Sequence, residues 1–144
     1  SERFIGGKEV EKFSDELSDK LKIEGGDHQE KPFVILCANG TDALQIALMA
    51  LGVGPGDEVI TPAFTFISTV EVVALLGAKP VLVDVHSDTF NIDCKAVEAA
   101  ITKKTKAIVP VHLFGQCADM ETLMEISMWN APLTATDGMG PLQS

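Results

Sequence analysis

The stretch VILCANGTDALQIALMALGVGPGDEVITP, residues 34–62, sets the order of the expected elements. An apolar run stops at Asn39-Gly40, and an apolar helical pattern then covers residues 42–51. The turn GVGPGD leads into a second apolar run over residues 58–61. Strand, helix and strand in this order are typical of an α/β fold. Because the helix is apolar on nearly every side, we expect it to be buried.

The same alternation continues along the rest of the chain. Apolar spacing and turn residues predict helices over 7–22, 42–51, 68–76, 94–101 and 120–126, and strands over 32–38, 58–61, 80–85 and 107–114. Asp93 and Asp119 are the expected N-caps of the last two helices. Continuous apolar strands predict a three-layer α-β-α architecture with a mainly parallel sheet. The segment 127–144 shows no strand pattern.

The composition excludes several classes of partner. The net charge is −10, from 21 acidic and 11 basic residues, which disfavours nucleic acid and anionic membranes. No signal peptide or membrane-spanning stretch is recognisable, so we expect no membrane association. The three cysteines, Cys37, Cys94 and Cys117, are far apart and fit neither a disulfide framework nor a zinc site. We therefore expect reduced thiols, no metal, and a cytoplasmic location.

Ligands of parallel α/β sheets gather at the carboxyl ends of the strands, where this sequence places Gly40, Thr41 and Asp42. A helix beginning there presents free amides and a partial positive charge, which suit a phosphate group. An ordinary N-cap formed by Thr41 or Asp42 explains the same residues. Neither a Walker loop nor a G-x-G-x-x-G motif is present.

The loop after the second expected strand carries two aromatic residues. Phe64 and Phe66 can stack on a flat heteroaromatic ring, or they can belong to the core. Asp84 and His112 also lie at strand ends, and Asp88 lies in the loop that follows the strand over 80–85. For these three, capping or hydrogen-bonded structural roles are the alternatives to catalysis.

Three segments carry a resemblance to a known family. They are residues 39–85 (NGTDALQIALMALGVGPGDEVITPAFTFISTVEVVALLGAKPVLVDV), 88–93 (DTFNID) and 96–120 (AVEAAITKKTKAIVPVHLFGQCADM). In order and spacing they resemble the DegT/StrS-type sugar-nucleotide aminotransferases. These are pyridoxal-phosphate (PLP) enzymes of fold type I. The resemblance covers residues 39–126 and includes the N-terminal RFIGGKEVEKF.

The resemblance implies a function and a site. The family transfers an amino group, usually from glutamate, to a keto sugar nucleotide in cell-surface polysaccharide or related glycan biosynthesis, and it is dimeric. It implies that Gly40, Thr41 and Asp42 hold the phosphate of PLP and that Phe66 covers the pyridine ring. Residues 1–126 would then be the N-terminal part of the PLP-binding large domain, followed by an atypical tail over 127–144.

The sequence also departs from the family pattern. The Glu-Asp-Ala-Ala motif and the lysine that forms the Schiff base are not found, and Lys103, Lys104 and Lys106 do not fit that motif. No catalytic residue is therefore assigned, and we expect this chain alone to be an inactive fragment that binds PLP weakly and noncovalently. The alternative is a noncatalytic α/β module that binds a phosphorylated small molecule or a partner chain. A dinucleotide-dependent oxidoreductase is a third interpretation, disfavoured by the missing glycine motif.

Overall fold

The structure, a computed structural model, describes residues 7–21, 32–129 and 134–135. The chain divides into two compact units, residues 1–38 and 39–144. In the first unit, helix α1 (Lys8–Lys20) confirms the expected N-terminal helix. The Ser14 hydroxyl donates a hydrogen bond of 2.9 Å to the Val34 carbonyl, and the Ser18 hydroxyl donates to the Pro32 carbonyl. These bonds connect α1 to the segment that follows residue 31.

The expected strand over residues 32–38 is wrong. This segment has no regular secondary structure, and Phe33 and Ile35 are 98% and 75% exposed. An apolar run becomes a strand only when a neighbouring strand supplies its hydrogen bonds. No strand among the described residues pairs with it. The sequence pattern therefore identified apolar residues correctly but could not identify their neighbours.

The second unit is built on a four-stranded sheet in the order β2-β1-β3-β4. Its strands are β1 (Glu58–Pro62), β2 (Lys79–Val83), β3 (Thr105–Ile108) and β4 (Thr134–Ala135). Every pairing is parallel, as expected, and every residue of the central strand β1 is buried. Ile60 of β1 lies opposite Val81 on one side and Ile108 on the other.

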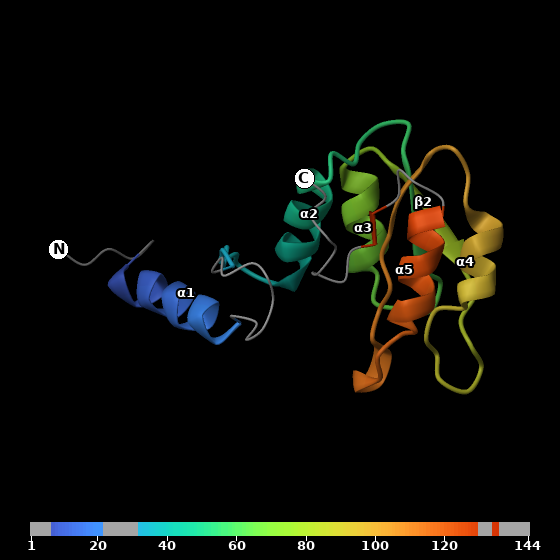
Figure 1. Cartoon of the computed structure of the whole chain (residues 1–144). Coiled ribbons are helices and arrows are strands. Elements are labelled where there is room, and N and C mark those ends of the chain that lie inside the picture. The colour runs from blue at the N-terminus through green and yellow to red at the C-terminus, as the bar shows by residue number, and fades with distance from the viewer. Residues whose placement is uncertain (1–6, 22–31, 130–133, 136–144) are drawn as a thin grey trace. The chain divides into compact units, whose positions relative to one another are not determined.

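Helices cover both faces of this sheet (Figure 1). The pair α2 (Gly40–Ala50) and α3 (Ser68–Leu75) covers one face, and the pair α4 (Cys94–Ala100) and α5 (Met120–Trp129) covers the other. Each face has its own apolar cluster. The first includes Leu48, Val59, Val72, Val73 and Ala107, and the second includes Ile60, Val97, Ile108, Leu123 and Ile126. The expected three-layer α-β-α architecture is confirmed.

Three local expectations differ from the structure. Strand β3 ends at Ile108 instead of residue 114, because Pro110 has no amide hydrogen for the ladder. The segment after residue 126 does contain a strand, since β4 pairs with β3. Helix α2 is buried on one side only: Leu48 is buried, whereas Ile46 and Met49 are exposed. Within the described residues, no helix is long and apolar enough to cross a membrane.

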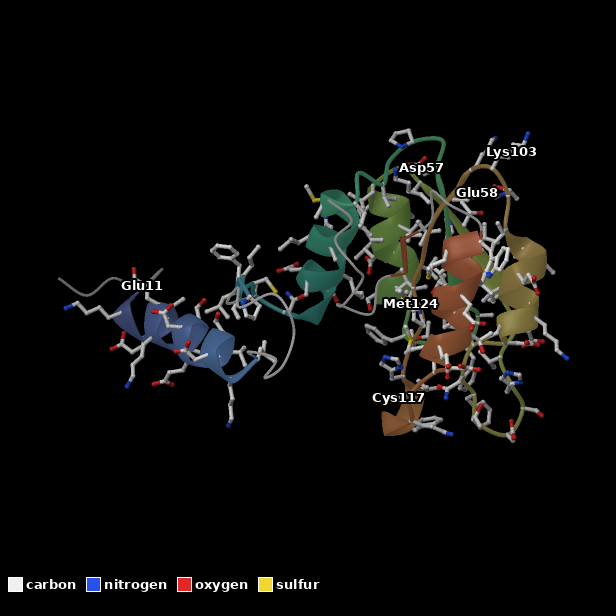
Figure 2. All side chains as sticks on the ribbon, in the orientation of Figure 1. Glu11, Asp57, Glu58, Lys103, Cys117 and Met124 are labelled. Atoms are coloured by element: carbon white, nitrogen blue, oxygen red, sulfur yellow. The ribbon has the colours of Figure 1, made fainter. Side chains whose placement is uncertain are left out.

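A buried carboxylate connects three segments at the amino edge of the sheet. Glu58 Oε1 lies 2.9 Å from Lys79 Nζ, and the Thr102 hydroxyl donates to Glu58 Oε2 at 2.7 Å. The Thr102 hydrogen bond, followed by the Lys79 ammonium, lowers the pKa of Glu58. Figure 2 shows Glu58, Asp57 and Lys103 together at this edge, with Cys117 at the opposite one.

Glu58→Gln tests this network through pH. Because the folded-state pKa is lowered, the carboxylate stabilises the fold above the unfolded pKa of about 4.3, and this contribution disappears as pH falls through the folded value. We expect urea denaturation to give the variant a lower free energy of unfolding than wild type at neutral pH. The difference between the two free energies should be smaller at acid pH. The exposed Glu71→Gln is the matched control. An equal difference at both pH values would contradict this role.

Candidate functional site

The topology places the candidate site outside the carboxyl ends of β1 and β3. These two strands are neighbours, but the helices that follow them, α3 and α5, cover opposite faces of the sheet. Their loops therefore diverge, and open α/β sheets bind their ligands in the crevice between loops of this kind. Helix α2 leads through a short turn into the amino end of β1, so α2 begins at this same carboxyl edge.

Asn39, and not Thr41 or Asp42, caps α2. Its side-chain oxygen accepts a hydrogen bond of 2.9 Å from the Asp42 amide, and its side-chain nitrogen donates to Asp42 Oδ2 at 3.2 Å. The first bond along the helix runs from the Ala43 amide to the Asn39 carbonyl at 3.1 Å. The amides of Gly40 and Thr41 precede it, so the helix supplies them with no acceptor. The Gly40 and Thr41 amides are therefore available to a ligand, whereas the Asp42 amide already donates to the Asn39 side chain.

Gly40 keeps the space in front of this helix start open. A Cβ built on Gly40 would meet no heavy atom within 4 Å, and its backbone is not left-handed. The glycine is therefore required neither by packing nor by backbone strain within this chain. Open space beside amides that lack a helical acceptor, at a helix N-terminus, is compatible with a phosphate group.

Phe66 lies two residues before α3, the helix that covers the same face of the sheet as α2. Its side chain is 74% exposed, so it does not belong to the core. Helix α3 packs against α2, and both helices begin at the carboxyl edge. The structure thus places Gly40, Thr41 and Asp42 at the start of α2 and Phe66 just before the start of α3, its packed neighbour.

Three other phenylalanines form a cluster at this edge that the sequence reasoning missed. The rings of Phe64 and Phe90 lie 5.2 Å apart, and those of Phe90 and Phe114 lie 6.0 Å apart in an edge-to-face arrangement. We call these three residues the aromatic platform. They come from the segments after β1, β2 and β3. The sequence singled out only Phe64, because Phe114 falls within the strand expected over 107–114.

The remaining candidates at strand ends have local roles. Asp84 and Asp88 accept hydrogen bonds from the amides that follow them, those of Val85 and Thr89. His112 Nδ1 accepts a hydrogen bond of 3.0 Å from the Ala118 amide, which holds the loop after β3. These contacts agree with the structural alternatives that the sequence left open.

The fold and the candidate site define a parallel α/β protein with a helix N-terminus and an exposed aromatic ring at the carboxyl edge of its sheet. The sequence profile of the DegT/DnrJ/EryC1/StrS aminotransferase family matches residues 1–131. The chain belongs to this family.

Curated relatives include two enzymes named for nucleotide sugars. UDP-2-acetamido-2-deoxy-3-oxo-D-glucuronate aminotransferase from Pseudomonas aeruginosa is 54% identical over 125 residues, which is 87% of this chain and 33% of that protein. GDP-perosamine synthase from Caulobacter vibrioides is 54% identical over 93 residues, which is 65% of this chain and 25% of that protein. The chain thus spans about a third or less of the length of these relatives.

A solved structure shares the fold. NtdA from Bacillus subtilis, with bound cofactor PMP, is 40% identical with a TM-score of 0.77, and the match covers 90% of this chain and 28% of that one. The likeness extends over most of this chain and confirms that its parallel sheet is part of an aminotransferase fold of type I.

Asn39→Ala tests the helix start. Loss of the cap should lower the free energy of unfolding by about 0.5–2 kcal/mol, because the Asp42 amide loses its acceptor. Asn39→Ser is the matched control, since serine caps about as well as asparagine and places no charge beside the Asp42 carboxylate. Chemical denaturation monitored by circular dichroism measures the free energy of unfolding of both variants. An alanine variant as stable as wild type would show that Asn39 does not hold the start of α2.

Proposed function

We propose that this chain supplies the phosphate-binding part of a PLP-dependent aminotransferase that acts on a keto sugar nucleotide. The observation that carries the proposal is the open space at Gly40, at a helix start whose Gly40 and Thr41 amides have no acceptor within α2. The exposed Phe66 on the same face and edge supports it. The names of the relatives, which specify UDP- and GDP-linked sugars and an aminotransferase, indicate the substrate class.

Different residues of the chain would bind different parts of the cofactor. The amides of Gly40 and Thr41 and the Thr41 hydroxyl would bind the phosphate, helped by the partial positive charge of the helix start. The Asp42 carboxylate accepts from the Asn39 side chain and so keeps the cap in place. Phe66 would cover one face of the pyridine ring and exclude water from it. PLP, when bound, supplies the electron sink for the reaction.

The lysines that the sequence offered do not reach this site. Lys103 and Lys104 precede β3, and Lys106 is its second residue, so all three lie toward the amino edge of the sheet, where Figure 2 shows Lys103. Gly40 and Phe66 lie at the opposite edge. We therefore propose that the chain by itself holds PLP without a covalent bond.

The setting of this site is also proposed. Residues 1–126 would form the N-terminal part of the PLP-binding large domain, and residues 127–144 an atypical segment; a boundary at 126 falls inside α5. The product would serve polysaccharide or related glycan biosynthesis, with glutamate as the amino donor. Exposed apolar side chains such as Ile46 and Met49 on α2 suit a homodimer. The three cysteines, which form no disulfide among the described residues, suit a reducing cytoplasm.

Gly40→Ala tests the phosphate site. The new methyl group enters the open space without touching the chain, so the fold should be unchanged or more stable, by up to about 1 kcal/mol. Affinity for PLP, measured by equilibrium dialysis, should fall at least about tenfold, because the methyl group occupies the space intended for phosphate. Gly54→Ala is the matched control, since Gly54 also has no neighbour within 4 Å and no left-handed backbone.

Two results would contradict the proposal. One is PLP affinity that is equal in wild type, Gly40→Ala and Gly54→Ala. The other is a stoichiometric amount of pyridoxyl group fixed on the wild-type chain by borohydride, which would show that one of its own lysines bonds to PLP.

A further inference from the structure

The aromatic platform is exposed where a core cluster would be buried. Phe64, Phe90 and Phe114 are 52%, 37% and 80% exposed, although their rings contact one another. Burial of apolar area drives ring contacts in a core, and here most of that area still faces solvent. Three rings from three different loops therefore meet at the surface of the crevice edge.

Two of these residues have a backbone conformation that side chains disfavour. Phe90 has φ 59° and Phe114 has φ 55°, and they are the only described residues other than glycine with positive φ. Bulky residues rarely adopt this conformation, which persists only where the surroundings impose it and is concentrated at functional sites. The conformation fixes the direction in which each ring leaves its loop.

Hydrogen bonds hold both loops in these positions. The buried Asn91, next to Phe90, donates from its side-chain nitrogen to the Cys117 carbonyl at 3.0 Å and so ties the loop after β2 to the loop after β3. The Phe90 amide donates to the His86 carbonyl at 2.8 Å, and the Ala118 amide donates to His112. The rings are therefore positioned before any ligand arrives, which reduces the entropy lost on binding.

We propose that the aromatic platform stacks against the nucleobase of the nucleotide-sugar substrate, an inference that rests on the proposed function. The platform lies at the carboxyl edge, next to the loops of β1 and β3 that flank the crevice. A ring face accepts a pyrimidine or a purine, because every base has a π face. That tolerance matches a family in which one relative is named for a UDP sugar and another for a GDP sugar.

The test compares UDP and GDP with inorganic diphosphate, which lacks the base. Titration calorimetry should show that both nucleotides bind the chain more tightly than diphosphate. Saturation-transfer NMR should show transfer to the base protons. Phe114→Ala should weaken both nucleotides about tenfold, whereas Phe114→Trp, which keeps a π face, should retain their affinity.

Two further variants distinguish the loss of a stacking ring from a disturbed loop backbone or a general effect of removing a phenylalanine. Phe64→Ala should also weaken both nucleotides, and Phe64 has no left-handed backbone that a substitution could disturb. Phe33→Ala, which removes an exposed ring outside the platform, is the matched control and should leave nucleotide affinity unchanged. PLP affinity should be the same in wild type and Phe114→Ala.

Specific results would overturn the inference. These are UDP that binds no better than diphosphate, nucleotide affinity unaffected by Phe114→Ala and Phe64→Ala, or a Phe114→Ala variant whose oligomeric state changes while nucleotide affinity does not. The last would identify the platform as a subunit contact. A different result would contradict only the proposed function. In that case nucleotides bind in a Phe114-dependent way, but PLP affinity is the same in Gly40→Ala and Gly54→Ala.

Discussion

The central strand β1 imposes the arrangement on which the rest of the second unit depends. It is paired on both sides and buried along its whole length. Its alternating side chains, Val59 on one face and Ile60 on the other, enter separate apolar clusters. A strand buried in this way needs helices on both faces, and parallel neighbours need those helices to return the chain. Every loop that follows a strand is therefore delivered to the same edge.

This arrangement separates the polar groups that hold the fold from those that it leaves without an acceptor. At the amino edge, Glu58 has both carboxylate oxygens engaged, by Lys79 and Thr102. At the carboxyl edge, the start of α2 leaves the Gly40 and Thr41 amides without helical acceptors, and Phe66 and Phe114 are exposed. Polar groups that are already satisfied hold the fold, while groups that are not remain available to a ligand.

Much of the second unit could be predicted from local patterns. The strands at 58–61 and 80–85 were recognised because branched apolar residues continued without a break, and Asp93 and Asp119 cap the helices as expected. The failures share one physical origin. Whether residues 32–38 form a strand depends on a partner, and β4 was not recognised because two residues are too few to show a pattern. Likewise, the one-sided burial of α2 reflects which neighbours it has.

For the site, the sequence by itself determined the chemical groups: a glycine and a threonine at a helix start, and the rings of Phe64 and Phe66 in the loop after a strand. Those depend on local turn chemistry and on residue type, which single-sequence reasoning can assess. Only the tertiary structure decided that Asn39 is the cap, that Gly40 faces open space, and that Phe64, Phe90 and Phe114 meet. The reason is that strand order in the sheet sets which loops become neighbours, and that order is fixed by contacts between residues far apart in the chain.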